Sequence, residues 1–196
     1  MSEPGEITVL PATAERWPDF EAIMGERGGY GGCWCMLWRL QRPAFDAGCG
    51  ASNRSAMKAI FEAGELPGLL AYDAGTAVAW CSVAPRAAFP RLERSRVLKA
   101  VDDQPVWSIS CFLILKSHRK RGLTKALILG ACDLVRERGG RILEAYPIEP
   151  KRRPYPPVFA WTGFAAPFLE LGFREVLRRA DTRPILRKDL TEGEGV

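Results

Sequence analysis

The sequence lacks the features that would place the protein in a membrane or build it around a structural metal. Its apolar runs fall well short of the roughly 20 residues that a membrane-spanning helix needs, so we expect no membrane partner. It has one histidine, His118, and among its six cysteines the close pair is Cys33 and Cys35, separated by one residue. Structural zinc sites combine four such ligands at wider spacings, so we expect no metal.

Two familiar phosphate motifs are also missing. A P-loop requires Gly-x-x-x-x-Gly-Lys-Ser/Thr, and the run Gly-Leu-Thr-Lys at 122–125 has neither the spacing nor the first glycine. A Rossmann fingerprint requires three spaced glycines, and this stretch has one. Internal repeats, low-complexity tracts and a secretory-leader pattern are absent from the sequence as well, so we expect reduced thiols and a cytoplasmic location.

The composition is that of a folded domain with a mild positive charge. Hydrophobic residues make up 47% of the 196 residues, enough for a core, and we expect a single domain over 7–190 between short tails at 1–6 and 191–196. The net charge of +5 and the pI of about 9.0 are compatible with an anionic cofactor, an acidic substrate or a nucleic acid.

The rest of the chain is organised around residues 106–140. Residues 106–115 are almost wholly apolar, 116–121 are mostly basic, and Gly122 precedes an apolar helical pattern that stops at Gly139 and Gly140. This order predicts a buried strand, a cationic turn and a helix. The first N–H groups of a helix lack intrahelical partners, so a turn at this position is a ready site for an anion.

The charges around this turn favour a bound anion. A helix start carries partial positive charge and prefers acidic neighbours, but Arg119, Lys120, Arg121 and Lys125 surround this one. A phosphate or pyrophosphate would explain the arrangement, because it accepts the N–H groups and neutralises the side chains. A solvated basic turn is the alternative. The position between a buried strand and a helix favours the anion site.

Two stretches resemble motifs of the GNAT superfamily, the acyl-CoA-dependent N-acyltransferases. Residues 119–124, Arg-Lys-Arg-Gly-Leu-Thr, fit the pyrophosphate motif Arg/Gln-x-x-Gly-x-Gly/Ala, except that Thr replaces the last small residue. Residues 168–173, Phe-Leu-Glu-Leu-Gly-Phe, resemble the late helix that ends in Gly-Phe. The order of predicted elements also matches over 7–190. The resemblance implies an α/β (α+β) fold with a central mixed, mostly antiparallel, splayed sheet flanked by helices.

The resemblance also implies a cofactor site for acetyl-CoA as co-substrate. The backbone of the central strand at Phe112, Leu113 and Ile114 would pair with the pantetheine arm. The turn that would hold the pyrophosphate comprises Arg119, Lys120, Arg121, Gly122, Leu123, Thr124 and Lys125.

Hydrophobic periodicity and turn residues predict the remaining elements. Strands are expected at 7–10, 68–72, 76–83, 107–115, 141–148, 173–179 and 183–188, and helices at 14–27, 53–63, 123–138 and 164–171. A proline-bounded insertion at 85–105 holds a short helix at 91–97, and its arginines, beginning with Arg86, are interpreted as a solvated face. An acidic acceptor or the cofactor's 3'-phosphate is their alternative partner. A basic loop at 149–157 is expected to form a lid or rim.

A glycine-rich loop at 28–32 leads into the candidate acceptor pocket. Cys33, Trp34, Cys35 and Trp38 follow it directly. Two tryptophans so close together either plug the core beneath the loop or form a wall of the acceptor pocket. The resemblance favours the wall, because in GNAT folds this segment borders the acceptor.

The catalytic residues of the family have no direct match. The position of its glutamate base is Ser108, which is no base by itself, and the position of its tyrosine acid is Phe168. We predict Glu144 as a substitute base, because a carboxylate in an apolar strand takes up a proton more readily than an exposed one. A salt bridge is its alternative role. Tyr146, two residues on and so on the same face, would protonate the leaving thiolate or simply pack. Cys111 is disfavoured as a nucleophile.

The sequence therefore favours an N-acetyltransferase that transfers an acetyl group from acetyl-CoA to a primary amine by direct attack. The acceptor is expected to be a small molecule rather than a protein, and assembly as a homodimer stays open. A CoA-binding module without catalysis is the first alternative. A nucleic-acid-binding protein, suggested by the basic runs at 116–121 and 151–153, is the weaker alternative, because aromatic residues do not alternate with these runs.

Overall fold

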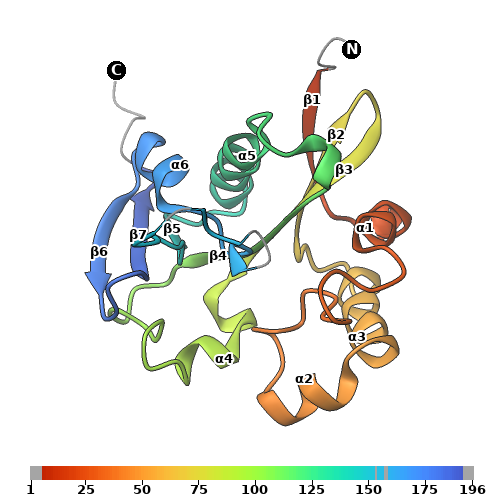
Figure 1. The fold of residues 1–196 in the computed structure, drawn as a ribbon, viewed down its shortest axis with the longest axis horizontal. Coiled ribbons are helices and arrows are strands. Elements are labelled where there is room, and N and C mark those ends of the chain that lie inside the picture. The colour runs from red at the N-terminus through yellow and green to blue at the C-terminus, as the bar shows by residue number, and fades with distance from the viewer. Residues whose placement is uncertain (1–5, 153, 157–158, 192–196) are drawn as a thin grey trace.

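The computed structural model describes residues 6–152, 154–156 and 159–191, and within them seven strands form one mixed sheet (Figure 1). The strand order is β1-β2-β3-β4-β5-β7-β6. In this described part, β4 and β5 are the parallel pair and the other neighbours are antiparallel. The strands are β1 (Ile7–Pro11), β2 (Gly68–Asp73), β3 (Thr76–Pro85), β4 (Trp107–Ile114), β5 (Ile142–Ala145), β6 (Arg174–Arg178) and β7 (Pro184–Asp189). The predicted mixed, mostly antiparallel sheet is confirmed.

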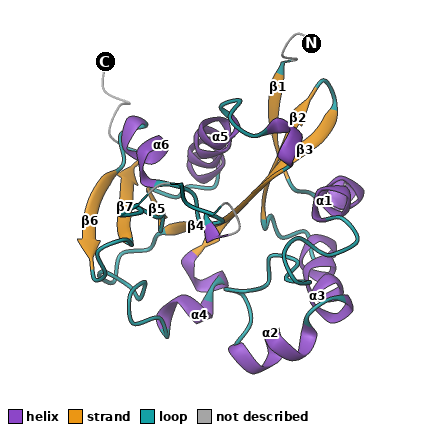
Figure 2. Ribbon diagram, viewed as in Figure 1, coloured by secondary structure: helices purple, strands orange, loops and turns teal. Residues whose placement is uncertain are grey.

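Helices cover both faces of this sheet (Figure 2). The helices are α1 (Trp17–Met24), α2 (Arg42–Gly48), α3 (Ala51–Glu62), α4 (Pro90–Glu93), α5 (Leu123–Glu137) and α6 (Ala165–Glu170). Helix α5 packs on β1 to β5 from one face, and α1 packs on β3 and β4 from the other. None of the helices in the described residues is long and apolar enough to cross a membrane.

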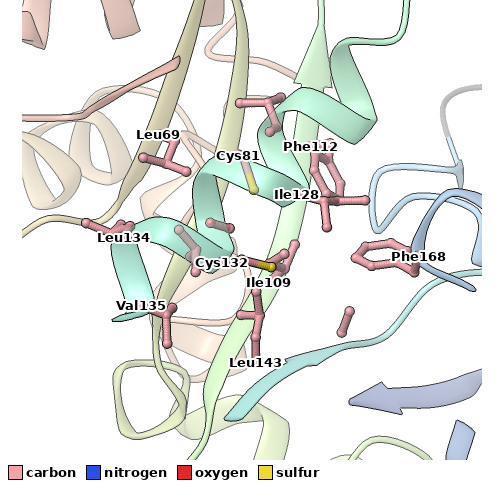
Figure 3. Close-up of a cluster of buried hydrophobic side chains, with 14 of the residues drawn as sticks. Leu69, Cys81, Ile109, Phe112, Ile128, Cys132, Leu134, Val135, Leu143 and Phe168 are labelled. Atoms are coloured by element: carbon pink, nitrogen blue, oxygen red, sulfur yellow. The ribbon is translucent and has the colours of Figure 1, made fainter. Parts of the chain in front are cut away.

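The largest core cluster lies between α5 and the sheet (Figure 3). Leu127, Ala131, Leu134 and Val135 follow helical spacing and are all buried. They meet Ile109 and other side chains of the central strands. Burying one large aliphatic side chain contributes about 1.5–3 kcal/mol, so this face holds α5 in place and fixes where its N-terminus lies.

Strand β4 bulges at Ser110, next to the point where it leaves β5. Strand β4 pairs with β5 only at 107–109, opposite 143–145. On its other side Ile109 lies opposite Val83 and Cys111 opposite Ser82, so Ser110 is an extra residue in the ladder. Such a residue bends its strand and increases the local twist. Beyond Ile109, β4 continues beside β3 while its other edge leaves β5, which is the splay that the resemblance implied.

Three helical segments differ from the expectations. The first helix is shorter, because a 3-10 turn at Ala14–Arg16 precedes α1 and Gly25, with φ 63°, ends it. The helix in the insertion covers only Pro90–Glu93. Helix α2 was not predicted from the sequence. Its second residue is Pro43, which the first turn of a helix accepts because the N–H there needs no intrahelical partner.

Candidate active site

The basic turn between β4 and α5 has left-handed backbone at two positions. Lys120 has φ 62°, and Gly122, the N-cap of α5, has φ 80°. A Cβ atom added to Gly122 would meet no atom within 4 Å, so the turn is open on that side. Left-handed residues in a turn direct successive N–H groups into one concavity, which suits an anion. The turn therefore has the backbone geometry of an anion site.

The side chains at the start of α5 do little to compensate its partial positive charge or to cap its free N–H groups. Its first turn carries no acidic residue, and its N-cap makes no side-chain hydrogen bond. Two of the four basic side chains are in ion pairs: Arg121 lies 2.8 Å from Asp73, and Lys125 pairs with Glu170. The backbone N–H groups, more than these two side chains, are available to an anion. Leu123 is buried and Thr124 half-buried.

Segments of the chain itself contact the open edge of β4. The N–H of Phe112 donates to the carbonyl of Trp161 at 2.6 Å, and the Nε of Arg119 donates to the carbonyl of Ile114 at 3.2 Å. Trp161 belongs to the segment between β5 and α6, which passes beside β4 (Figure 1). Leu113 lies opposite Trp80 of β3. Of the three residues predicted to hold a cofactor arm, Phe112 and Ile114 thus present backbone groups on the open side.

The three candidate catalytic residues meet in one buried cluster. The hydroxyl of Tyr146 donates to Glu144 Oε1 at 2.5 Å and lies 2.8 Å from the hydroxyl of Ser108. Arg86 also donates to Glu144 Oε1, at 2.9 Å, and Arg187 donates to Oε2 at 2.7 Å. Burial raises the pKa of Tyr146, and the charge of Glu144 adds to this effect, so the phenol stays a neutral donor.

These contacts are those of a buried ion pair, the alternative role considered for Glu144. Both oxygens accept hydrogen bonds from guanidinium groups, and protonating the carboxylate would weaken contacts with Arg86 and Arg187. The interpretation of Arg86 as part of a solvated face is wrong, because its side chain is 11% exposed and joins this cluster. Its partner lies 58 residues away, so no local pattern indicated the contact.

The loop that was predicted to form the acceptor wall divides into two parts. Trp34 is buried and stacks on Trp17, with ring centroids 6.2 Å apart, so it belongs to the core. Gly28 allows this packing, because a Cβ there would lie 2.1 Å from the indole nitrogen of Trp34. Cys35 is buried as well, whereas Cys33 is half-buried.

Trp38 lies at the edge of an open pocket. Its ring centroid is 5.8 Å from that of Trp161, and the guanidinium of Arg91 lies 5.9 Å from its ring. The pocket, of about 360 Å³, is lined by Trp38, Gln41, Arg42, Pro43, Arg91, Arg94 and Ser95. Trp38 is therefore a member of the loop that lines an open pocket. A pocket of about 480 Å³ lies beside the first residue of β4 and the C-terminal end of α5, away from the turn.

Part of the predicted basic rim can be placed. Lys151 pairs with Asp181, and Tyr155 packs edge-on against Phe164 at 6.1 Å. Arg153 and Pro157 lie outside the described residues, as do most of the predicted tails.

All six cysteines are free thiols. Within the described residues no cluster of three His, Cys, Asp or Glu side chains could hold a metal ion.

Comparison with known proteins gives a family match and a set of similar folds. Residues 34–154 match the model of the Acetyltransferase (GNAT) family. No curated protein matches the sequence. A GNAT-family acetyltransferase from Listeria monocytogenes is 12% identical, with a TM-score of 0.58 over 94% of this chain and 95% of that one.

Two further structures of the same fold contain a cofactor. The yncA protein of Salmonella typhimurium, with its cofactor acetyl-CoA, is 13% identical, with a TM-score of 0.56 over 96% of each chain. The PaiA N-acetyltransferase of Thermoplasma acidophilum, in complex with coenzyme A, is 10% identical, with a TM-score of 0.51 over 94% of this chain and 99% of that one. At these identities the similarity shows the fold alone.

Proposed function

The chain belongs to the acetyltransferase (GNAT) family, and we propose that it transfers an acetyl group from acetyl-CoA to the primary amine of a small molecule by direct attack. The observation that carries this proposal is the turn at Gly122. Its open side, its left-handed backbone and the uncapped start of α5 are what a pyrophosphate needs. Solved structures of the same fold contain acetyl-CoA and coenzyme A.

The residues present fit this cofactor. The N–H groups at 120–124, with Arg119 beside them, would hold the pyrophosphate, and the open edge of β4 would pair with the amides of the pantetheine arm. Bound acetyl-CoA supplies the acetyl group as an activated thioester. The hydrogen bond from Phe112 to Trp161 supports this role, because it shows the edge binding a peptide carbonyl. Trp161 must release Phe112 before the arm can pair there.

Glu144, Tyr146 and Ser108 form a hydrogen-bonded row on the side of the sheet opposite α5. Glu144 as the general base stays a prediction, and its two guanidinium partners favour the ion-pair role. Tyr146 keeps its proton and so remains a candidate donor to the leaving thiolate. Ser108 links Tyr146 to the central strand.

Acetyl-CoA binding and turnover test the proposal together. Acetyl-CoA should stabilise the folded protein by mass action, by about 2.7 kcal/mol at a concentration one hundred times Kd. The melting temperature should therefore rise when acetyl-CoA is added. Release of free CoA thiol with a panel of small primary amines should show transfer. Binding without turnover on any amine would favour the CoA-binding module.

Gly122→Glu tests whether the turn itself binds the pyrophosphate, and a matched control accounts for the general effects of a substitution. The new carboxylate would lie where the pyrophosphate binds, so the thermal shift should disappear. Gly139→Glu is the matched control: Gly139 also has a left-handed backbone, φ 72°, with no atom within 4 Å of an added Cβ, but it lies beyond the other end of α5. Equal thermal shifts in the two variants would show that the phosphate assignment is wrong.

A further inference from the structure

The pocket beside Trp38 lies between the loop that follows α1, the first turn of α2 and the end of α4. We call it the arginine pocket, because three of its seven lining residues, Arg42, Arg91 and Arg94, carry a guanidinium group. Its volume of about 360 Å³ is near the lower end of the range for small-molecule sites, about 300–1,000 Å³. A pocket of this size accommodates a small molecule rather than a protein segment.

Trp38 connects the arginine pocket with the open edge of β4. Its ring centroid lies 5.8 Å from that of Trp161, whose carbonyl accepts a hydrogen bond from the N–H of Phe112 on that edge at 2.6 Å. Trp38 also packs against the buried cluster that includes Tyr146. In Figure 1, α2 and α4 lie at the bottom of the view, whereas the turn before α5 lies in its upper half. The pocket is therefore close to the edge proposed for the cofactor arm and away from the pyrophosphate turn.

The positive charge of the arginine pocket is not balanced within it. The described residues that line the pocket include no acidic side chain. Arg42 pairs with Asp46, one turn further along α2 and outside the lining. Arg91 and Arg94 have no acidic partner in the part of the chain that the structure describes. The pocket therefore keeps the charge of two guanidinium groups.

The acidic residue nearest to Arg94 in sequence is directed elsewhere. The Nε of Arg86 donates to Glu93 Oε1 at 2.6 Å, and the same guanidinium donates to Glu144 at 2.9 Å. Glu93 is thus engaged with an arginine of the buried ion pair, while Arg94 and Ser95, the next two residues, line the pocket. The insertion between β3 and β4 therefore separates its charges, and its positive side faces the pocket.

Arg91 is held in place by the protein itself. Its backbone N–H donates to the carbonyl of Trp38 at 3.3 Å, and its Nη1 donates to the carbonyl of Leu37 at 3.1 Å. Its guanidinium also lies 5.9 Å from the ring of Trp38 and 5.8 Å from the ring of Phe45. A guanidinium that is already fixed loses little conformational entropy on binding, and its planar fork matches a carboxylate or a phosphate.

We propose that the arginine pocket binds the acceptor, and that this acceptor is a small primary amine that also carries an oxyanion, either a carboxylate or a phosphate monoester. This inference rests on the proposed function and names its substrate class. Arg91 and Arg94 hold the oxyanion, and the amine end of the molecule lies on the Trp38 side, toward the edge of β4. A diamine brings only positive charge, so the same two arginines repel it.

The first test measures binding in the presence of CoA, which has no acetyl group to transfer. γ-Aminobutyrate, putrescine and butylamine are similar in length and differ in the charge at the end away from the amine. Isothermal titration calorimetry should show γ-aminobutyrate binding at least about tenfold more tightly than the other two, with a preference that weakens as salt is added. Equal binding of the three amines, or tighter binding of putrescine, would overturn the proposal.

Arg94→Gln tests whether this preference arises in the pocket, and Arg96→Gln is the matched control. Both arginines are exposed, but Arg96 lies outside the lining. Arg94→Gln should weaken the binding of γ-aminobutyrate about tenfold, because it removes a charge-assisted contact with the carboxylate, and Arg96→Gln should not change it. Equal losses in the two variants would show a general effect of net charge and would contradict the proposed site.

The second test is acetyl transfer to the same amines and to O-phosphoethanolamine, followed by release of CoA thiol. The oxyanion-bearing amines should have the higher kcat/KM, and the better of the two identifies the preferred oxyanion. Arg94→Gln should act mainly by raising KM for that amine, because the contact is made in the bound substrate and the transition state alike. Transfer without a preference for an oxyanion would refute the acceptor class alone. Selective binding of γ-aminobutyrate without transfer to any amine would refute acetyl transfer and support the oxyanion site by itself.

Discussion

At the scale of single residues, the site departs from its family at two positions. Ser108 replaces the expected base, and Phe168, where the family has tyrosine, is buried against Phe112 and Phe173 in the core. The sequence predicted that Glu144 and Tyr146 lie on one face of a strand, because side chains two residues apart in a strand point the same way. It did not predict that Ser108 of β4 joins them by a hydrogen bond to Tyr146. It could not predict that Arg86 and Arg187 join them, because those contacts depend on tertiary packing.

We expect Glu144→Gln to act mainly on stability. Removing the charge leaves Arg86 and Arg187 buried without their shared carboxylate, which typically costs about 3–5 kcal/mol of unfolding free energy. Glu93→Gln is the control, because Glu93 also pairs with Arg86 but its side chain is 53% exposed, where such pairs contribute about 0–1 kcal/mol. Chemical denaturation of the three proteins measures the difference.

The rate profile of Glu144→Gln tests whether Glu144 is the general base. If the carboxylate only holds the ion pair, the acidic limb of the profile persists in this variant at a temperature where the variant is folded. Disappearance of that limb, with acetyl-CoA affinity unchanged, would instead make Glu144 the base that the sequence predicted.

At the scale of elements, local patterns predicted most of the fold. The strand, turn and helix between Trp107 and Glu137 were predicted because the apolar run, the glycine and the helical spacing are all encoded within 31 consecutive residues. The bulge at Ser110 left no such signal, because it exists only in the register between β4 and β3.

Two leucines of α5 test which face of this helix packs on the sheet and so holds the turn in position. Leu127 is fully buried, and its replacement by alanine should lower the free energy of unfolding by about 2–5 kcal/mol, because it leaves a cavity against the sheet. Leu129, two residues on, is 47% exposed, and Leu129→Ala should change stability by about 0.5 kcal/mol or less. Equal losses measured by urea denaturation would contradict the burial of this face.

At the scale of the whole molecule, the distribution of charge bears on the alternative function as a nucleic-acid-binding protein. The net charge of +5 allowed a nucleic-acid binder, but Asp73 and Glu170 pair with Arg121 and Lys125 in the basic turn, and Asp181 pairs with Lys151 in the second basic run. The cations that suggested a nucleic-acid surface are thus partly neutralised within the chain. Arg119 and Lys120 keep their charge beside the backbone N–H groups of the turn, and such a small positive site suits one compact anion better than an extended strand of phosphates.

The state of the thiols makes a prediction for the whole molecule. All six cysteines are free, and three of them, Cys35, Cys81 and Cys132, are buried in apolar clusters where they pack as small hydrophobic side chains. The melting temperature should therefore be the same with and without dithiothreitol. A structural disulfide would contribute about 2–5 kcal/mol, so its reduction would lower the melting temperature by several degrees. Counting thiols under denaturing conditions, without reductant, is the independent check: six would agree with the structure, and four would reveal a bridge that these side chains do not form.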